Sequence, residues 1–533
     1  MLKIILSALI AGSLSRAFQF QLPLDILDRF RLTKPEHPPP PPVVISSSRP
    51  PRIAIIGAGA GGSSAAFWIS KAKERYNLDV TVDVYERSDY IGGRSTTAHP
   101  YNDTAYEPVE LGASIFVGVN KNLQRAVKEF NFSLYGFDDE DGDLGIWDGE
   151  QVLYTAKGSG TLASLLSKLK FLWRYGYRSP TKTQELIRAM LDKYVTLYDP
   201  DTPKWASIEA LNDALNWTEF ITQTGAEYFQ SRGISEQYAT EIIEAGTRVN
   251  YAQNIDRIHA LEAMCSLAAD GGVSVRGGNW QIFEQFVKRS GAQVFLNTEV
   301  IGIKRLSDHA WTVVTEKERR NYEAVVIAAP YHTSHITLPA DLSTLIPPQP
   351  YVHLHVTLLT TAAATPNPVY FGYKPGSRPP TTVLTTFNGA REGGNASEFL
   401  SLTYHGKTKF AKNETHERQE TDEWVVKIFS MERISDEWLS SVFQNQVGWV
   451  LRKEWNSYPV LPPTTSFPPI KLDSGLFYVN AFEPFISAME TETLASRNVV
   501  DLLLREKFNS SICLMEWENK ADVSEGFVYG WDC

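Results

Sequence analysis

The chain has 533 residues and a formal net charge of −11, and 43% of its residues are hydrophobic and 12% aromatic. This composition indicates a globular protein, and the length predicts two or three interleaved units because one hydrophobic core rarely serves so many residues. The negative charge argues against a nucleic-acid-binding protein, since phosphate recognition depends on clustered cations.

The N-terminus has the pattern of a targeting segment. One lysine precedes an apolar stretch from Ile4 to Leu14, and small residues follow up to Ala17 at the spacing of a cleavage site. Residues 1–17 therefore predict a secretory signal peptide, too short to cross a bilayer, with a retained N-terminal anchor as the alternative. Residues 18–51, which contain "HPPPPPVV", predict an extended linker. No later window is apolar enough to predict a membrane span.

Acceptor sites for N-glycosylation support the same route. Six Asn-x-Ser/Thr sequences occur, at Asn102, Asn131, Asn216, Asn395, Asn413 and Asn509. We therefore expect passage through the secretory pathway, ending in a vacuole, a lysosome or the medium. An acidic chain also suits an acidic compartment.

Three cysteines and ten histidines form neither a disulfide framework nor a metal-binding pattern, so no metal is expected. Cys513 and Cys533 could pair near the C-terminus. Cys265 is expected to be a buried helix residue.

A dinucleotide-binding motif begins at residue 52. Arg52 to Ile56 predicts a buried parallel strand, and the turn "GAGAGG" follows it. Gly57 suits the backbone angles of the turn, Gly59 permits close approach of a pyrophosphate, and Gly62 lets helix and strand meet. Gly61 begins a predicted helix that runs to Tyr76 and directs its first N–H groups at the phosphates.

The next strand carries the acid that this motif requires. Val80 to Tyr85 predicts a strand, and Glu86 at its end is placed to accept hydrogen bonds from the adenosine ribose hydroxyls. Arg87 beside it is assigned to the same cofactor. The order of strand, glycine turn, helix, strand and acid makes this a strong signature.

The continuation "YIGGRSTT" distinguishes FAD from NAD. Gly92, Gly93 and Arg94 resemble the second signature of the amine oxidase and phytoene desaturase class of flavoproteins, in which a glycine bend and an arginine meet the FAD pyrophosphate. FAD is therefore the expected cofactor, and covalent attachment stays open.

Later segments fit the same class. The stretch "ELGAS" from Glu110 resembles the strand that re-enters beside the isoalloxazine, and "GGNW" from Gly277 opens a predicted helix. In "AQVFLNTEVIGI", expected to be one strand, Val300 resembles the residue whose backbone pairs with adenine. "YEAVVIAAP", residues 322–330, predicts the strand that ends at the cofactor.

The C-terminal segment completes the expected cofactor site. A strand over residues 476–480 leads to Phe482 and Glu483, and a helix begins at residues 488–491, where Met489 and Glu490 lie. In the amine oxidase class the corresponding helix directs its N-terminus at the flavin, where negative charge accumulates on reduction.

The expected fold is α/β, with a discontinuous Rossmann-type, amine oxidase-like FAD-binding domain and an inserted substrate domain. Helical periodicity over residues 120–270 and alternating runs over residues 351–458 predict mixed helices and antiparallel sheet in the insertion. The charged stretch at residues 412–423 is expected to be a solvated loop. The predicted limits are 52–119, 271–340 and 470–510 for the FAD-binding domain, 120–270 and 341–469 for the substrate domain, and 511–533 for a C-terminal tail.

Four stretches of the sequence together resemble one particular family more closely than they resemble the fold class as a whole. "DVYERSDYIGGRSTT", "VRGGNWQIF", "EAVVIAAP" and "LFYVNAFEPFISAMETETLASRNV" resemble the prenylcysteine oxidase, or prenylcysteine lyase, family over nearly all of residues 52–505. The resemblance implies an FAD-dependent thioether oxidase. Its substrates would be farnesylcysteine or geranylgeranylcysteine with O2 and water, and its products cysteine, a prenyl aldehyde and H2O2.

Such chemistry needs little from the protein's own nucleophiles. The carbon between sulfur and the alkene loses a hydride easily, because the sulfur lone pair and the allylic system both stabilise the cation. Water then adds, and the hemithioacetal collapses to thiol and aldehyde, so the cofactor performs the difficult step. No catalytic residue is assigned; Glu483, Glu490 and His332 are weak candidates for a base that assists the water.

The substrate requires a long apolar slot. The stretch "LKFLWRYGYR" is the candidate wall, through Leu169, Phe171, Leu172, Trp173, Tyr175 and Tyr177. Arg174 or Arg178 could meet a substrate carboxylate. Core packing or peripheral contact with a membrane explains this stretch equally well.

Two alternatives remain at this point. The flavoprotein could oxidise another isoprenoid, amine or thioether, because a fold does not fix a reaction. It could also be a flavin-bearing lipid-binding protein without turnover.

Overall fold

The computed structural model describes residues 50–136, 142–157, 162–202, 204–269, 271–307, 310–411, 420–514 and 526–533. The expected signal peptide, nearly all of the proline-rich linker and the sequon at Asn413 lie outside these residues. Among the helices described, none combines the length and the apolar character that crossing a membrane requires.

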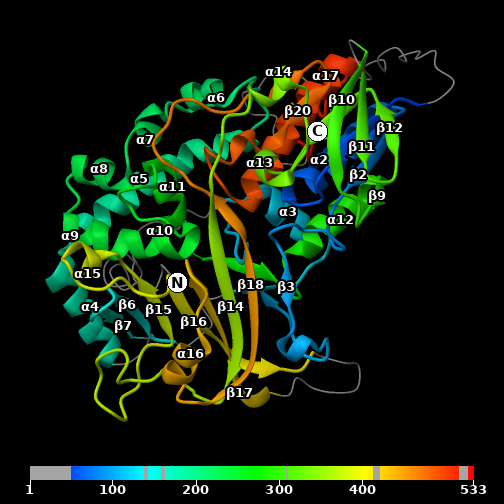
Figure 1. The fold of residues 1–533 in the computed structure, drawn as a ribbon. Coiled ribbons are helices and arrows are strands. Elements are labelled where there is room, and N and C mark those ends of the chain that lie inside the picture. Colours follow the sequence, from blue (N-terminus) through cyan, green and yellow to red (C-terminus); the bar gives the residue numbers. More distant parts are fainter. Residues whose placement is uncertain are drawn as a thin grey trace, which may run out of the picture.

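A six-stranded sheet forms the centre of the upper half of the molecule (Figure 1). Its strands are, in order across the sheet, β19 (Lys471–Asp473), β20 (Leu476–Tyr478), β13 (Ala324–Ile327), β1 (Arg52–Ile56), β2 (Thr81–Tyr85) and β9 (Gln293–Phe295). All neighbours pair in parallel except β19 and β20. Ile53 to Ile56 are buried, as expected of a strand covered on both faces.

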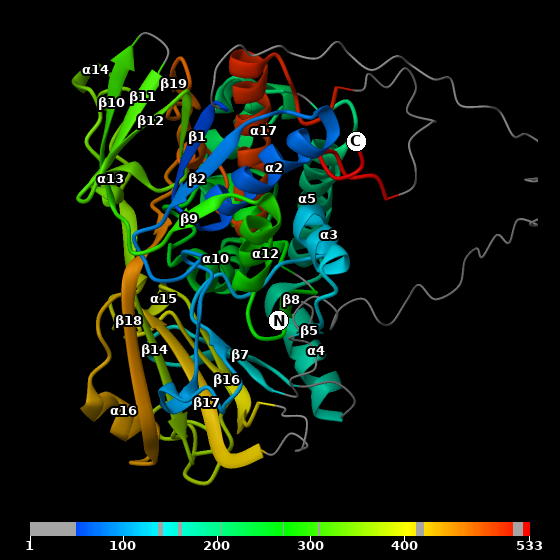
Figure 2. The same cartoon turned by 90° about the vertical axis from the view of Figure 1, so that its right-hand side faces the viewer.

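Helices cover one face of this sheet, and a smaller sheet covers the other (Figure 2). The helices are α2 (Ala60–Tyr76), α12 (Trp280–Ser290) and α17 (Met489–Phe508), and α2 packs against both of the others. The smaller sheet has the strands β10 (Val300–Ser307), β11 (Ala310–Thr315) and β12 (Arg319–Tyr322). The expected Rossmann-type α/β fold is therefore confirmed.

Two predicted strands differ from those observed. The stretch 292–303 forms β9 and β10 in different sheets, because Asn297 between them has a left-handed φ of 50° that turns the chain. The stretch 322–330 contributes only β13 to the central sheet, since Tyr322 already ends β12.

A seven-stranded sheet forms the lower half of the molecule (Figure 1). Its order is β18 (Val447–Pro459), β14 (Tyr351–Thr361), β17 (Glu420–Ser430), β16 (Ser401–Lys409), β15 (Thr382–Thr385), β6 (Leu144–Trp147) and β7 (Val152–Ala156). Only β15 and β6 pair in parallel. The region expected to be mainly helical thus supplies two strands of this sheet, and the end of the charged stretch, Glu420–Glu423, belongs to β17 and not to a loop.

A group of helices extends along the left side of the molecule in Figure 1, from the level of the central sheet down to the seven-stranded sheet. They are α4 (Leu162–Tyr175), α5 (Arg178–Tyr194), α6 (Ile208–Leu215), α7 (Thr218–Thr222), α8 (Gly225–Ser231), α9 (Glu236–Tyr238), the π-helix η4 (Ala239–Ile243), α10 (Glu244–Tyr251) and α11 (Ala260–Leu267). The helix α3 (Lys121–Glu129) instead contacts α12 and α17 of the upper half.

Short elements connect these parts. They are β3 (Thr97–Ala98), η1 (Pro100–Asn102), β4 (Val109–Glu110), β5 (Leu134–Gly136), η3 (Val195–Tyr198), β8 (Val273–Val275), α13 (Tyr331–Ser334), α14 (Ala340–Ser343), α15 (Asn388–Arg391), α16 (Asp436–Val442) and η5 (Val479–Phe482). The predicted strand at residues 476–480 therefore ends two residues early, where η5 begins.

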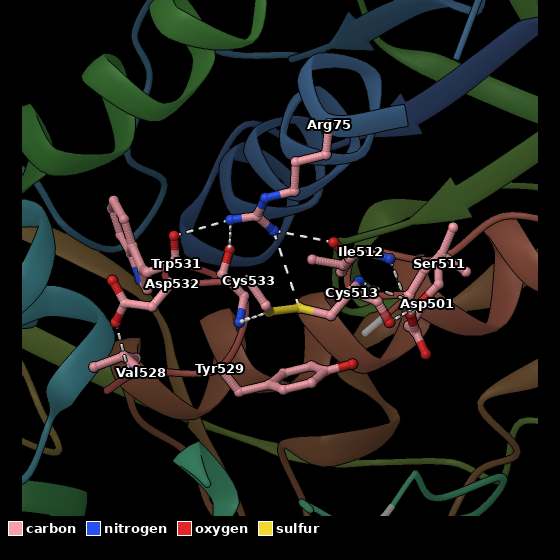
Figure 3. Close-up of a disulfide and its surroundings, with 12 residues drawn as sticks. Arg75, Asp501, Ser511, Ile512, Cys513, Val528, Tyr529, Trp531, Asp532 and Cys533 are labelled. Carbon is pink, nitrogen blue, oxygen red and sulfur yellow. Dashed lines mark hydrogen bonds between the residues drawn. A yellow bond between two sulfur atoms is a disulfide. The ribbon is translucent and has the colours of Figure 1, made fainter. Parts of the chain in front are cut away.

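A disulfide joins Cys513 to Cys533, so the pairing that the sequence left open is present (Figure 3). The guanidinium of Arg75 on α2 lies beside it and donates hydrogen bonds to the carbonyl oxygens of Ile512, Gly530 and Trp531. Burial lowers the pKa of Arg75. The last residues of the chain are thereby tied to the C-terminal end of α2.

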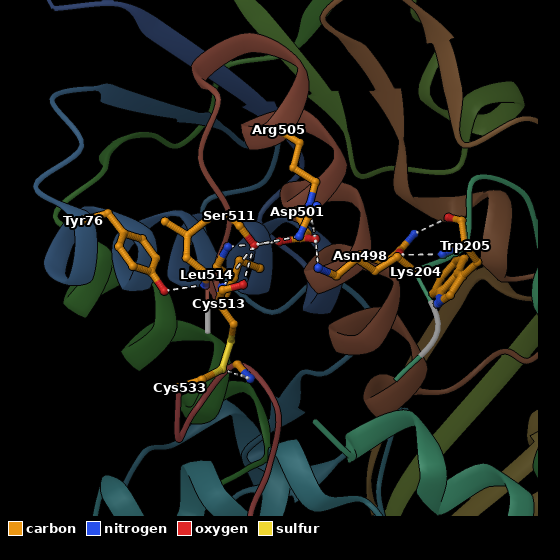
Figure 4. A network of polar contacts seen from close by, with 12 residues as sticks. Tyr76, Lys204, Trp205, Asn498, Asp501, Arg505, Ser511, Cys513, Leu514 and Cys533 are labelled. Atoms are coloured by element: carbon orange, nitrogen blue, oxygen red, sulfur yellow. Dashed lines mark hydrogen bonds and ion pairs between the residues drawn. A yellow bond between two sulfur atoms is a disulfide. The ribbon is translucent and has the colours of Figure 1, made fainter. Parts of the chain in front are cut away.

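Asp501 on α17 holds the start of this tail (Figure 4). Its carboxylate accepts hydrogen bonds from the Ser511 hydroxyl and the Ile512 amide, and it pairs with Arg505 at 2.9 Å. The Leu514 amide donates to the Tyr76 hydroxyl of α2 at 2.6 Å. The tail therefore braces two of the helices that cover the central sheet.

Candidate active site

A cavity of about 810 Å³ lies where the central sheet meets the lower half of the molecule. Most residues expected to bind the cofactor line it, namely Gly57, Gly59, Gly61, Glu86, Arg87, Gly92, Gly93, Arg94, Val300, Glu483 and Met489. They come from segments far apart in sequence, so the fold gathers them in one space.

The glycine turn forms one end of the cavity. Gly57 has a φ of 103°, and a Cβ there would lie 2.5 Å from the Ala328 carbonyl oxygen. A Cβ on Gly62 would lie 1.8 Å from the Gly57 carbonyl oxygen, so α2 and β1 meet there as expected. A Cβ on Gly59, in contrast, would have its nearest neighbour at 3.7 Å, the Cα of Gly93. The space in front of Gly59 suits a group that approaches the backbone closely.

Glu86 holds this turn in place. Its Oε2 accepts a hydrogen bond from the Ala58 amide, and its Oε1 accepts one from the Ser88 amide, both at 2.8 Å. Each carboxylate oxygen has a second lone pair, so these bonds leave capacity for the ribose hydroxyls. The sequence indicated the ribose role and did not reveal the backbone role.

Arg94 and Glu483 both line the cavity and contact each other. Arg94 donates hydrogen bonds to the Glu483 carboxylate and, at 2.9 Å, to the Ser457 carbonyl oxygen, and the Tyr351 hydroxyl also donates to Glu483. Burial acts to lower the pKa of Arg94, but Glu483 and Tyr351 outweigh it and raise the pKa. In this structure Glu483 therefore fixes Arg94 at the cavity, where the sequence predicted a pyrophosphate contact.

Glu492 on α17 is a cavity residue that the sequence reading missed. Its Oε2 lies 2.8 Å from where a Cβ of Gly61 would be, and its Oε1 has no hydrogen-bond partner among the described residues. Burial, with Glu483 nearby, raises its pKa well above the usual range, which favours the protonated form. A protonated carboxyl can donate a hydrogen bond to a phosphate, whereas a carboxylate would repel it. Helical spacing offered a signal, since Glu492 and Ser496 share the face that meets Gly61.

Two predicted cofactor contacts lie elsewhere. Phe482 is buried against Trp205 and Phe485. Glu490 faces α3, where it accepts hydrogen bonds from the amides of Asn122 and Leu123 and from the Tyr198 hydroxyl. It thus satisfies amides at the N-terminus of α3. Burial raises the pKa of Glu490 to about 7.

The suggested water bases gain no support. His332 on α13 has its Nε2 at 2.9 Å from the Pro347 carbonyl oxygen, and it does not line the cavity. Glu483 is engaged by Arg94 and Tyr351, and Glu490 faces α3. We therefore assign no catalytic base.

The other end of the cavity is apolar and is walled by helices other than α4. Its apolar lining residues include Met190, Leu191 and Tyr194 of α5, Ile242 of η4, Val249 of α10 and Leu384 of β15. Cys265 on α11 also lines it, half-buried with a free thiol, whose pKa burial raises. The region named from the sequence does supply the wall, but through different helices.

The wall predicted at residues 169–177 was wrong. Phe171 and Tyr175 of α4 pack into the protein against Tyr154 and Tyr238, while Leu169, Leu172, Trp173 and Tyr177 are exposed. The guanidinium of Arg174 is paired with Glu241 at 2.7 Å, and that of Arg178 lies 3.5 Å from where a Cβ of Gly233 would be. Periodicity identified an apolar helix, but it carries no information on what the helix faces.

A polar surface closes the cavity opposite these helices, on β16 and β17. Lys427 is buried there and donates hydrogen bonds to the Glu110 carbonyl oxygen at 2.9 Å and to the Ser114 hydroxyl at 3.1 Å. Burial raises the pKa of the Glu110 carboxyl to about 8. Burial and then Lys427 lower the pKa of His405 to about 3, so this imidazole is neutral. A lysine within the apolar run "VVKIF" was a signal in the sequence for this site.

Three exposed or half-buried side chains form one potential metal-ligand group within the described residues. Ligand atoms of His353, His355 and Glu454 lie within 4.8 Å of one another on β14 and β18, where His355 faces Glu454 across the strands. Their spacing in the sequence did not predict a metal site. Exposed groups of this kind are common without an ion.

Comparison with known proteins identifies the family. The family model described as prenylcysteine lyase matches residues 160–515, more than half of the chain, and an NAD(P)-binding Rossmann-like domain model matches residues 55–130. The chain belongs to the prenylcysteine lyase family.

Two curated members of this family align with most of the chain. Farnesylcysteine lyase of Arabidopsis thaliana is 28% identical over 470 residues, which cover 85% of this chain and 88% of the plant protein. Human prenylcysteine oxidase 1 is also 28% identical, over 489 residues that cover 86% of this chain and 89% of the human protein. The resemblance inferred from the four quoted stretches is confirmed.

Solved structures show the fold of this family member. A variant of putrescine oxidase superposes with a TM-score of 0.56 at 16% identity and covers 86% of this chain and 100% of its own. Cyclohexylamine oxidase from Brevibacterium oxydans superposes with a TM-score of 0.53 at 14% identity, covering 86% of this chain and 99% of its own. Family and fold together imply a flavin cofactor. The site fits one, because an added Cβ finds backbone within 3 Å at Gly57 and Gly62, whereas the space before Gly59 is open.

Proposed function

We propose that the chain is an FAD-dependent oxidase that cleaves the thioether of prenylcysteines. One prenylcysteine, one O2 and one water would give cysteine, a prenyl aldehyde and H2O2. The observation that carries this proposal is one continuous cavity, which has a glycine cradle at one end and, at the other, apolar helices opposite a buried lysine.

FAD is the proposed flavin because the cradle has the parts that its adenosine diphosphate half requires. Gly59, Gly93, Glu86 and Val300 all line the cavity, where the two glycines would give the pyrophosphate room, Glu86 would meet the ribose and Val300 the adenine. Glu492, whose pKa burial raises, adds a hydrogen-bond donor beside Gly61 when it is protonated. When bound, the flavin supplies the two-electron acceptor for the substrate carbon.

The prenyl chain is proposed to lie along α5, η4 and α10. Met190, Leu191, Ile242 and Val249 offer an apolar surface there, and burying a farnesyl group gains about 25 cal/mol per Å² of apolar area.

The cysteine end is proposed to meet Lys427. Its Nζ lies on the polar surface of the cavity, where it donates hydrogen bonds to the Glu110 carbonyl oxygen and the Ser114 hydroxyl. A substrate carboxylate can accept a charge-assisted hydrogen bond from such a group. Lys427 would therefore orient the substrate, with its thioether toward the middle of the cavity.

We also propose a secretory-pathway location, in a vacuole, a lysosome or the medium. The five described sequon residues, Asn102, Asn131, Asn216, Asn395 and Asn509, are all exposed. The disulfide between Cys513 and Cys533 suits an oxidising compartment. Removal of N-glycans from the native protein should lower its apparent mass; an unchanged mass would contradict the proposal.

The first experiment tests flavin and turnover together. The purified protein should be yellow, and anaerobic farnesylcysteine should bleach the flavin band; air should then restore it with release of H2O2. Bleaching by another isoprenoid, thioether or amine, with none by farnesylcysteine, would favour the alternative oxidase. Bound flavin that no such compound bleaches would favour a lipid-binding protein.

Variants locate the cofactor in the cradle. Glu86→Ala and Gly59→Val should lose flavin, because the first releases the turn and the second fills the approach to it. Gly136→Val on β5 is the matched control, since a Cβ there meets nothing within 4 Å among the described residues. Full flavin content in both cradle variants would refute the assignment.

The orientation by Lys427 has its own test. Lys427→Met should raise KM for farnesylcysteine about tenfold or more, the usual range for losing a charged hydrogen bond, and leave KM for a farnesyl thioether without an amino acid group nearly unchanged. Lys427→Arg should restore part of the difference. Equal effects on both substrates would show that Lys427 does not bind the amino acid end.

A further inference from the structure

The helix α4 has two apolar faces. Phe171 and Tyr175 point inward with Ser164 and Ser167, and all four are buried. The outer face carries five large apolar side chains with exposed fractions of 54% for Leu165, 51% for Leu166, 55% for Leu169, 37% for Leu172 and 89% for Trp173. Figure 2 shows α4 at the periphery of the lower half.

These five residues form one stripe. At 3.6 residues per turn they fall within an arc of about 120° on the helix surface. On the same projection Lys168 lies on one side of the stripe, and Lys170 and Arg174 lie on the other. The inner face already anchors α4, so the outer residues are not needed to hold the helix in the fold. A contiguous exposed patch of this kind indicates a contact surface.

The charge around α4 contrasts with that of the whole chain. The net charge of the protein is −11, yet residues 151–184 contain no Asp or Glu and six basic residues. Three of these, Lys157, Arg174 and Lys182, pair with Asp143, Glu241 and Glu185, so the positive charge that α4 offers at its surface comes mainly from Lys168 and Lys170. Leucine and tryptophan on one face with lysine at its borders is the composition of a helix that lies in a membrane surface. Basic residues there favour anionic lipids.

We propose that the outer face of α4 docks on a lipid surface that contains anionic headgroups. Leu165, Leu166 and Leu169 enter the boundary between headgroups and acyl chains, and Trp173 takes the interfacial position that this side chain prefers. Lys168 and Lys170 contact lipid phosphates. The contact is peripheral, and it goes beyond the proposed function because it needs neither flavin nor turnover.

Vesicle binding of the full-length mature holoprotein tests this. The protein should cosediment with vesicles of phosphatidylcholine and phosphatidylserine, bind less to phosphatidylcholine alone, and bind less as salt rises. The double variant Leu166→Gln/Trp173→Gln should lower the partition coefficient about tenfold or more, because two buried apolar side chains are lost. Lys168→Gln/Lys170→Gln should remove mainly the preference for phosphatidylserine.

Controls separate docking from folding. Both double variants should keep the melting temperature and flavin content, and Leu345→Gln, at another exposed leucine, should leave vesicle binding unchanged. Failure of the wild type to bind vesicles, or undiminished binding of Leu166→Gln/Trp173→Gln, would overturn the proposal. A dimer in sedimentation that this variant dissociates would assign the face to a second copy instead. If deletion of residues 18–49 abolishes vesicle binding while the α4 variants retain it, the membrane contact would belong to residues 18–49.

Discussion

The two ends of the cavity are built in different ways. The glycine end comes largely from residues 52–94, where one turn, one helix start and one strand end supply the contacts. The apolar end combines α5, η4, α10 and α11 with β15, β16 and β17, which span residues 178–430. A site built from consecutive residues leaves a motif in the sequence. A site assembled by packing leaves only an apolar pattern.

The neighbouring helices α4 and α5 show that an apolar pattern does not reveal which helix lines the cavity. Both have helical periodicity and apolar side chains, and only Gly176 and Tyr177 separate them. α5 lines the cavity, whereas the outer face of α4 is exposed. The inner face of α4 packs against Tyr154 of β7 and Tyr238 of α9, and these contacts keep the helix away from the cavity.

The largest expected effect is at the glycine end. Gly62→Val should abolish soluble folded protein or flavin binding altogether, since its Cβ would overlap the Gly57 carbonyl oxygen. Gly59→Ala is the matched variant and should fold with a near-native melting temperature while binding flavin more weakly. Expression level, melting temperature and flavin absorbance measure this. If Gly62→Val is stable and binds flavin, the glycine end of the cavity is less rigid than its contacts imply.

A pH effect on stability should come from α11, one of the helices at the apolar end. Burial raises the pKa of Glu262 on α11 from 4.5 to about 8. Folding therefore favours the protonated form, so this contribution is complete below about pH 4.5 and is lost as pH rises through 8, up to about 5 kcal/mol. Melting temperatures from pH 5 to 8 should fall more steeply in the wild type than in Glu262→Gln. If the melting temperatures of the wild type and Glu262→Gln fall equally with pH, the pH dependence arises from groups other than Glu262.

The two faces of α4 should differ in stability. Phe171→Ala should lower the free energy of unfolding by about 3–5 kcal/mol because it leaves a cavity in the core. Trp173→Ala should change it by about 0.5 kcal/mol or less, since Trp173 is exposed. Denaturant unfolding compares the pair. A large loss for Trp173→Ala would mean that the outer face is covered in solution.

The smallest effect concerns the cavity wall. Val249→Trp should lower kcat/KM for farnesylcysteine about tenfold, mainly through KM, because the larger side chain occupies part of the slot. Leu166→Trp on α4 is its control and should leave kcat/KM for the dissolved substrate unchanged. Steady-state H2O2 release measures both. Equal kcat/KM for Val249→Trp and the wild type would remove α10 from the wall.

Single polar residues show how far prediction from the sequence extended. Glu86 was predicted because it ends a strand at a fixed place in a motif, whereas Glu490 was misassigned because helix position alone does not give side-chain direction. Lys427 was missed although its apolar neighbours in the sequence indicated burial. Its partners, Glu110 and Ser114, are more than 300 residues away in the chain.

The sequence by itself determined the succession of strand, glycine turn, helix and strand at residues 52–85, the acid Glu86 after it, and the family. These depend on backbone conformation and on residue types at fixed short spacings, which act wherever the segment lies. Only the tertiary structure decided which helices wall the cavity, that Glu490 turns to α3, and that α4 presents leucine and tryptophan outward. Hydrophobic packing has no direction of its own, so burial of an apolar face is settled by what the rest of the chain places against it.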